Sequence, residues 1–325
     1  MTGREGGDRA GTASGGARLM AGHPAPFDPG SFDPRAFGAA WSASLRRGTD
    51  AELRAWLELA LACCDLADGI ALRHFRRDLE ISSKPDHTLV TQADRAIELA
   101  LRERILAAHP DHGLVGEEYG TESAGASVRW HVDPIDGTHN FVRGIPVFAT
   151  LLGVERDGEL QVGVLSAPAL RERWFAWRGG GAWAIRAAAP VRVEVSRVHR
   201  LADAQVLYAS PFEVMTTGWA PGFEALVRGA WRDRGFGDFW GYALVAEGAA
   251  EAMIEVGLKS WDMAAPTVLV EEAGGRLSDL AGARGLGIGS VVATNGTLHG
   301  AVLAALAGRA ADASRQPREA GDASR

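Results

Sequence analysis

Residues 130–141 read Trp-His-Val-Asp-Pro-Ile-Asp-Gly-Thr-His-Asn-Phe, and this stretch decides how the rest of the chain is interpreted. Two carboxylates, Asp133 and Asp136, lie three positions apart. Pro134 stands between them, fixes its own φ and favours a turn. Such a turn can aim both carboxylates and the carbonyl of Ile135 at one point. An Asp-Gly pair alone is a common turn, but this longer run is far more constrained and therefore indicates a site.

The residues that follow Asp136 suit a negatively charged ligand. Gly137 and Thr138 can begin a helix that continues through His139 and Asn140. The N–H groups at the start of a helix have no partner within it and attract anions. The same short stretch therefore offers carboxylates and a place for an anion.

Three further acidic segments stand apart from ordinary surface charge. Asp94 begins an expected helix just after residues 89–91, Glu117 follows a short strand, and Asp262 opens a helix expected over residues 263–273. Taken singly, an Asp at a helix start is usually a cap, and a Glu after a strand is usually solvated. Hard divalent cations such as Mg²⁺ require oxygen ligands. Several carboxylate segments in one chain are what a site for several metal ions needs.

Composition bounds the class of protein. The chain has 325 residues, of which 46% are hydrophobic and 23% charged, as in a globular protein with a sizeable core. A net charge of −7 argues against a dedicated nucleic-acid binder. No apolar run reaches the about 20 residues of a membrane-spanning helix, and no secretory signal is expected. Cys63 and Cys64 are adjacent, so we interpret both as reduced packing residues of a cytoplasmic protein.

The pattern of elements predicts one folded domain over residues 49–308, between a flexible extension (1–48) and a flexible tail (309–325). Apolar residues at helical spacing predict a helix around residues 53–64 and a second over residues 91–108. The remaining expected elements are strands at 113–116, 129–132, 147–156, 160–166, 174–177, 191–195, 206–209 and 251–256, and helices at 222–231, 240–248 and 263–273. Blocks of helices and hairpin-linked strands indicate a layered α+β fold and not a repeating βαβ barrel.

These motifs resemble the inositol monophosphatase superfamily over about residues 50–305. Its first signature is similar to residues 130–141, and its second is similar to residues 261–265 continuing to 271–275. The segments around Asp94 and Glu117 stand in the expected order before them. The resemblance implies the layered αβαβα sandwich of the sugar phosphatases and a magnesium-dependent phosphatase that acts on a small polar phosphate ester.

The resemblance also implies particular residue roles. Its metal ligands correspond to Glu117, Asp133, the Ile135 carbonyl, Asp136 and Asp262. It implies two or three Mg²⁺ ions per site, with Mn²⁺ as a substitute, and in-line attack by a metal-activated water. Glu117 and Thr138 would orient or deprotonate this water, with Asp94 paired to Thr138. Gly137 and Thr138 match a phosphate-cradling turn, and Lys84 resembles a loop lysine above the site.

Within the superfamily, the chain most resembles the bacterial histidinol-phosphate phosphatases. The similar stretches are residues 140–147, 164–170, 237–240, 244–248 and 292–296. Histidinol phosphate carries an ammonium and an imidazole opposite its phosphate, so its pocket should add negative groups away from the metals. Glu255 faces opposite to the apolar residues of its strand and resembles the family position at the substrate's polar end. Asp238 is the second candidate, although it could simply cap a helix and Glu255 could simply face solvent.

Other readings of the same motifs remain open. Inositol monophosphatases, and nucleotide or fructose bisphosphate phosphatases, use the same metal chemistry. A non-catalytic regulator on this fold, which binds a protein or RNA, would be expected to lack some ligands and to be less acidic. The expected partner is therefore a small-molecule phosphate ester, with no nucleic acid and no membrane, and the resemblance alone implies a homodimer.

Overall fold

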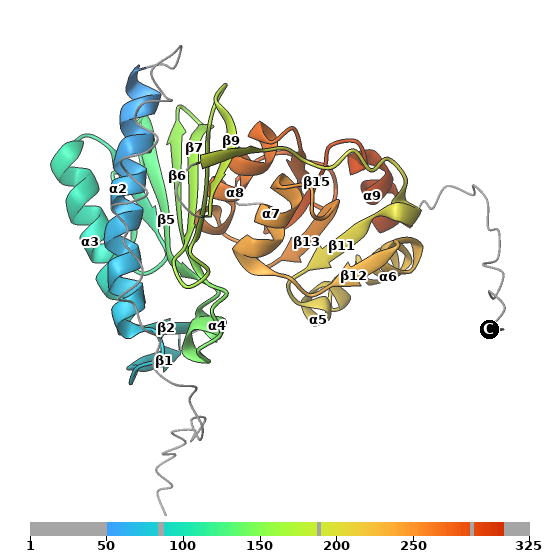
Figure 1. Cartoon of the computed structure of the whole chain (residues 1–325), viewed down its shortest axis with the longest axis horizontal. Helices are drawn as coiled ribbons and strands as arrows, with labels where there is room; N and C mark the ends of the chain where they lie inside the picture. Colours follow the sequence, from blue (N-terminus) through green and yellow to red (C-terminus); the bar gives the residue numbers. More distant parts are fainter. Residues whose placement is uncertain (1–50, 84–87, 187–189, 287–288, 309–325) are drawn as a thin grey trace, which may run out of the picture.

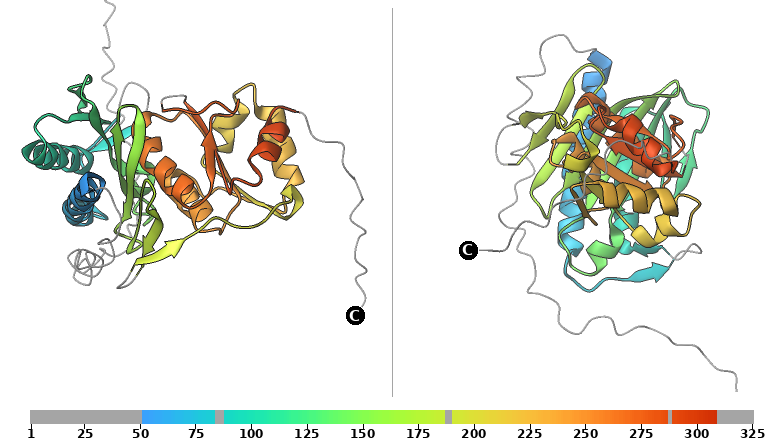
Figure 2. Two further views of the ribbon diagram at one scale, coloured as in Figure 1. Left: turned by 90° about the horizontal axis from the view of Figure 1, so that it is seen from above. Right: turned by 90° about the vertical axis from the view of Figure 1, so that its right-hand side faces the viewer.

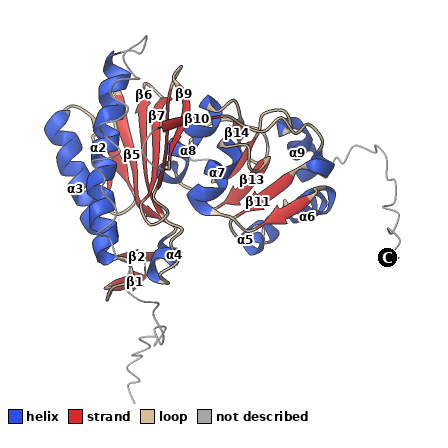
Figure 3. Ribbon diagram, in the orientation of Figure 1, coloured by secondary structure: helices blue, strands red, loops and turns tan. Residues whose placement is uncertain are grey.

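Five alternating layers of helix and sheet make up the fold (Figure 1). The computed structural model describes residues 51–83, 88–186, 190–286 and 289–308. The expected extension, the expected tail and Lys84 lie outside these residues. In space, two long helices cover a large sheet, a second helical layer lies between that sheet and a smaller one, and three helices form the far outer layer (Figures 2 and 3). The expected αβαβα sandwich is confirmed.

The first outer layer consists of α2 (Ala51–His74) and α3 (Gln92–Ala108). Their apolar residues recur every three or four positions, and this stripe is buried against the large sheet. Cys63 and Cys64 are both buried and unbridged, in agreement with the expected packing role. In α3, the hydroxyl of Thr91 accepts a hydrogen bond from Ala93 N at 3.1 Å and thereby caps the helix.

The large sheet is antiparallel except at one pair of strands. Its eight strands, in spatial order, are β10 (Pro190–Val193), β9 (Gly181–Ile185), β8 (Glu172–Trp177), β7 (Glu159–Ala167), β6 (Ala149–Arg156), β5 (Val128–Asp136), β3 (Gly113–Gly116) and β4 (Gly120–Glu122). Only β3 and β5 run parallel, with Gly116 opposite Val132. Both strands therefore end at the same edge of the sheet, which is the edge that carries the site.

The smaller sheet has five strands and packs between the two remaining helical layers. Its spatial order is β12 (Arg232–Arg234), β11 (Gln205–Tyr208), β13 (Ala252–Val256), β15 (Ser290–Thr294) and β14 (Arg276–Ser278). The middle layer is α7 (Asp238–Ala246) and α8 (Ser260–Glu272), and the far layer is α5 (Pro211–Met215), α6 (Ala220–Gly229) and α9 (His299–Leu306). Short β1 (Ile81–Ser83), β2 (Leu89–Thr91), α4 (Thr138–Val142) and η2 (Leu201–Asp203) complete the described elements.

Several element boundaries differ from expectation. The strand expected at 129–132 continues to Asp136, with a shift of register between Asp133 and Asp136. Pro134 lacks an N–H and lies within this irregular part of the strand instead of forming a turn after it. The helix expected from residue 263 begins at Ser260, so Asp262 lies within its first turn. Strands β9, β12, β14 and β15 and helices α5 and α9 were not expected.

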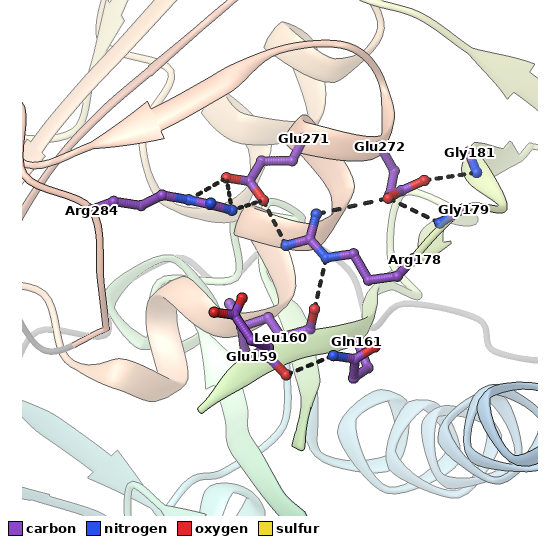
Figure 4. A network of polar contacts seen from close by, with 9 residues as sticks. All are labelled: Glu159, Leu160, Gln161, Arg178, Gly179, Gly181, Glu271, Glu272 and Arg284. Atoms are coloured by element: carbon purple, nitrogen blue, oxygen red, sulfur yellow. Dashed lines mark hydrogen bonds and ion pairs between the residues drawn. The ribbon is translucent and has the colours of Figure 1, made fainter. Parts of the chain in front are cut away.

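Helix α8 packs closely on the large sheet because glycines of the sheet, which have no side chain, lie at the contact. A methyl group on Gly163 would lie 2.4 Å from the carbonyl oxygen of Ala265. The far end of α8 is clamped by charge: Arg178 donates to Glu271 at 2.6 Å, and Arg284 donates to the same carboxylate at 2.8 Å (Figure 4). These cations offset the unfavourable position of an acidic residue at a helix C-terminus.

Candidate metal and phosphate site

The parallel pair of strands brings the first carboxylates together. Glu117 directly follows β3, and its backbone N donates to the carbonyl of Val132 at 3.3 Å. Asp133 is the next residue of β5. Since β3 and β5 end at the same sheet edge, Glu117 and Asp133 lie together there, although they belong to different segments of the chain.

Asp136 and Gly137 form the transition from β5 to α4. Gly137 has φ +80°, a left-handed conformation that favours glycine, and its Cβ position lies 3.1 Å from the carbonyl oxygen of Val147. Asp136 Oδ2 accepts a hydrogen bond from Phe239 N at 2.6 Å, which joins the end of β5 to the start of α7. The sheet edge and the middle helical layer are thus locked together at this point.

The start of α8 supplies the last expected metal ligand. Asp262 Oδ2 accepts a hydrogen bond from Lys259 N at 2.7 Å, so this carboxylate does cap its helix. His131, in the middle of β5, contacts Ser260 Oγ at 3.2 Å and Glu155 at 2.7 Å. This histidine therefore ties β5 to the beginning of α8.

A cavity of about 380 Å³ joins these elements. Among the described residues, its lining includes every residue expected at the site except Asp94, and it adds several neighbours. The lining residues are Thr88, Leu89, Glu117, Asp133, Ile135, Asp136, Gly137, Thr138, His139, Asp238, Glu255, Val256, Gly257, Leu258, Lys259, Trp261 and Asp262. Carboxylates from five separate segments therefore line one space: those of Glu117, of Asp133 and Asp136, of Asp238, of Glu255 and of Asp262. Of the four acidic segments singled out in the sequence, the one around Asp94 does not line it.

Acidic side chains crowd this cavity and raise one another's pKa values. The pKa of Asp133 is raised well above its usual range, first by burial and then by the charges of Glu117 and Asp136. The pKa of Asp136 is likewise raised, first by burial and then by Asp238 and Glu255. A bound cation would reverse both effects because it favours the charged carboxylate.

The donor set fits a hard cation. Every candidate ligand is an oxygen, and the buried Asp133 Oδ1 has no hydrogen-bond partner, so it is available to a metal ion. Within the described ranges, however, no three His, Cys, Asp or Glu side chains are already arranged to hold a metal ion. Asp136 and Asp262 each direct one oxygen at a backbone N–H instead. The full ligand set therefore stays a prediction.

One expected pairing is wrong in this structure. The Thr138 hydroxyl donates to the carbonyl of Ile135 at 2.9 Å, not to Asp94. Asp94 Oδ2 instead accepts from the N–H of Thr91 at 2.8 Å and from its hydroxyl at 2.5 Å, while Asp94 Oδ1 is buried without a hydrogen-bond partner. The reason is local: Asp94 occupies the third position of α3 and satisfies the capping residue of its own helix.

Glu98 is a site residue that sequence reasoning missed. Its carboxylate is fully buried and accepts hydrogen bonds from Glu118 N at 2.6 Å and from Tyr119 N at 3.1 Å. Arg102 Nε pairs with the same carboxylate at 2.9 Å. Glu98 thereby holds the loop that carries Glu117. The only signal in the sequence is a Glu–Arg pair at helical spacing, which is usually a surface feature.

Glu255 and Asp238 both reach the cavity, as expected. Glu255 is only 7% exposed, so it does not simply face solvent, and its carboxylate accepts from the Tyr242 hydroxyl at 2.6 Å. Burial, then the charge of Asp238, raises the pKa of Glu255 to about 8. Asp238 is the first residue of α7, and its Oδ2 accepts from Asn140 Nδ2 at 3.2 Å.

Comparisons with known proteins agree with the family resemblance found in the sequence. The inositol monophosphatase family model matches residues 52–312. The chain is 47% identical over 257 residues to a histidinol-phosphatase of Mycobacterium tuberculosis, covering 77% of this chain and 97% of that protein. It is 42% identical to a histidinol-phosphatase of Streptomyces coelicolor, covering 76% and 95%. The structure of an extragenic suppressor protein suhB from Bartonella henselae superposes with a TM-score of 0.72 at 29% identity, covering 78% and 98%.

Layered fold, carboxylate-lined cavity and relatives together define a metal-dependent phosphatase that acts on a small molecule. The chain belongs to the inositol monophosphatase family. No helix in the described part of the chain is long and apolar enough to cross a membrane.

Proposed function

We propose that this phosphatase hydrolyses L-histidinol phosphate to L-histidinol and inorganic phosphate. One observation carries the proposal: Asp238 and Glu255 add two carboxyl groups to the cavity beyond the expected metal ligands, and a cation beside them favours their charged forms. A substrate with a cationic end opposite its phosphate matches both ends of such a site. The two relatives named histidinol-phosphatase, at 47% and 42% identity, support the same substrate.

The cofactor in this proposal is Mg²⁺, two or three ions per site, with Mn²⁺ as a substitute. Glu117, Asp133, the Ile135 carbonyl, Asp136 and Asp262 would hold it, and these oxygen donors suit magnesium. The Ile135 carbonyl accepts one hydrogen bond from Thr138 and keeps a second lone pair. When bound, divalent cations stabilise charge on a phosphoryl group and make a nearby water more acidic.

The residues of the chain perform the remaining work. Glu117, which lies on the loop that Glu98 holds, accepts the proton of the attacking water. The Thr138 oxygen orients that water. Gly137 and Thr138 position the phosphate at the start of α4. Asp94 is a buried carboxyl group whose charge interacts with those of Glu118 and Glu117, and it would act through this interaction and not through a bond to Thr138. The phosphate ester then breaks by in-line displacement, without a phosphorylated residue.

A phosphate-release panel on the purified full chain tests the substrate. L-Histidinol phosphate, inositol 1-phosphate, fructose 1,6-bisphosphate and a nucleoside monophosphate are compared, each with Mg²⁺ and with EDTA. We expect the highest kcat/KM for histidinol phosphate and no turnover in EDTA. A clear preference for inositol phosphate would make this chain an inositol monophosphatase and overturn the substrate assignment.

The variant Asp133→Asn tests the metal site. It removes one carboxylate charge and keeps the shape of the side chain, so turnover should fall by at least a thousandfold while the far-UV circular dichroism stays unchanged. Near-normal activity in saturating Mg²⁺ would contradict the ligand assignment.

We also propose a cytoplasmic homodimer. The two buried free thiols, Cys63 and Cys64, suit a reducing compartment. Burial raises the pKa of the Cys63 thiol to about 12, so it is unreactive at neutral pH. Light scattering on a size-exclusion column measures the assembly, and a mass of one chain would refute the dimer.

A further inference from the structure

A second cavity adjoins the metal and phosphate site. Its volume is about 430 Å³, and it shares Asp238 and Glu255 with the first cavity. Its other walls come from α4 and the loop after it, from the residues between β11 and α5, from α5, and from the loop before α7 with the first turn of that helix. None of these segments carries an expected metal ligand. A molecule whose phosphate lies at the metal site can therefore extend into this second space, which we call the distal subsite.

Acidic side chains line the distal subsite. Three carboxylates line it, those of Glu213, Asp238 and Glu255, and among the described residues no Lys, Arg or His does. The first cavity differs, since Lys259 and His139 contribute to it. Burial has the largest effect on the pKa of Asp238 and raises it. The charge of His139 lowers this pKa, and the charge of Glu213 raises it, so Glu213 lies close enough to act on Asp238.

Two aromatic rings form the remaining specific feature of this subsite. Phe236 and Trp240 have ring centroids 5.1 Å apart, with planes tilted by 39°. Both line the cavity, and Phe236 is 36% exposed although it is a large apolar side chain. Aromatic faces attract organic cations and stack on flat heterocycles, whereas polyols gain little from them.

We propose that the distal subsite is a recognition site for the cationic, heteroaromatic end of the substrate, formed by Glu213, Phe236 and Trp240 together with Asp238 and Glu255. It thereby selects phosphate esters whose organic group is cationic over those whose organic group is neutral. This inference rests on the proposed function. Glu213 is a specificity-determining residue, because it lines the distal subsite alone and not the cavity of the expected metal ligands.

The test compares Glu213→Gln and Phe236→Leu with the wild-type chain. The control is Glu224→Gln, which removes the same charge from an exposed residue of α6 that lines neither cavity. For each protein, the readout is the ratio of kcat/KM for L-histidinol phosphate to kcat/KM for inositol 1-phosphate. We expect this ratio to fall about fivefold in Glu213→Gln through a higher KM for histidinol phosphate, and to stay unchanged in the control.

A second measurement separates this inference from the proposed function. Calorimetric titration with L-histidinol, which lacks the phosphate, reports on the distal subsite even if no ester is hydrolysed. Weaker binding to Glu213→Gln and Phe236→Leu than to the control supports the subsite whatever the outcome of the phosphate-release panel. Equal binding to all proteins, no binding to the wild type, or an unchanged kcat/KM ratio overturns the inference.

Discussion

The substitution Gly116→Ala tests how the loop of Glu117 is held in place. Gly116 is the last residue of β3, and a methyl group added there would lie 1.9 Å from Glu98 Oε1 and 2.5 Å from Glu98 Cδ. These distances are far shorter than any van der Waals contact. The Glu98 carboxylate must therefore move, although its side chain is fully buried and engaged on every side.

The magnitude follows from what Glu98 would lose. Its carboxylate accepts from Glu118 N and Tyr119 N at 2.6 and 3.1 Å and pairs with Arg102 at 2.9 Å. A hydrogen bond to a charged group contributes about 1.5–3 kcal/mol, and disruption of a buried ion pair costs about 3–5 kcal/mol. Because these losses overlap, we expect Gly116→Ala to lower the free energy of unfolding by about 3–5 kcal/mol.

Function should suffer with stability, because the displaced loop carries Glu117. Urea unfolding measures the stability, and the Mg²⁺ concentration for half-maximal phosphate release measures the site. We expect that concentration to rise at least tenfold. Gly125→Ala is the matched control, since nothing lies within 4 Å of its added methyl group, and it should change stability by no more than about 0.5 kcal/mol. A Gly116→Ala protein within 1 kcal/mol of wild type with a normal Mg²⁺ requirement would refute the role of Glu98.

Three further predictions concern other parts of the molecule. Gly163→Ala should displace α8 from the sheet, because the methyl group meets the Ala265 carbonyl oxygen at 2.4 Å; thermal unfolding should show a loss of about 2–4 kcal/mol together with reduced kcat. Burial raises the folded-state pKa of Asp94 to about 7 from an ordinary value near 3.8, so the stability that protonated Asp94 contributes to the metal-free chain is present below pH 4 and is lost as pH rises towards 7. Unfolding in EDTA across this pH range should therefore show a smaller decline in the free energy of unfolding for Asp94→Asn than for the wild type. An equal decline in the two proteins would contradict the raised pKa. Asp68→Asn breaks the buried pair with Arg173, at 2.7 Å, and should destabilise the fold by about 3–5 kcal/mol while kcat of the folded enzyme stays within twofold.

Local sequence determined a good part of this fold. The apolar stripes of α2 and α3 predict both helices because one buried face is enough to define a helix. The strand predicted at 113–116 agrees with β3 at both ends. The short stretches that include β9 and β15 carry little periodicity of their own, and their place is decided by neighbouring strands, so they could not be predicted.

The sequence by itself singled out Asp133 and Asp136, because the run from Asp133 to Thr138 restricts its own backbone and carries two carboxylates. Glu117 and Asp262 were predicted as ligands through the resemblance to the family. Only the tertiary structure decided which groups meet. The parallel pairing of β3 with β5 sets Glu117 beside Asp133, and the adjoining cavity brings Glu213 towards Glu255. Such pairings depend on hydrogen bonds and packing between segments far apart in the chain, and no local pattern of residues encodes them.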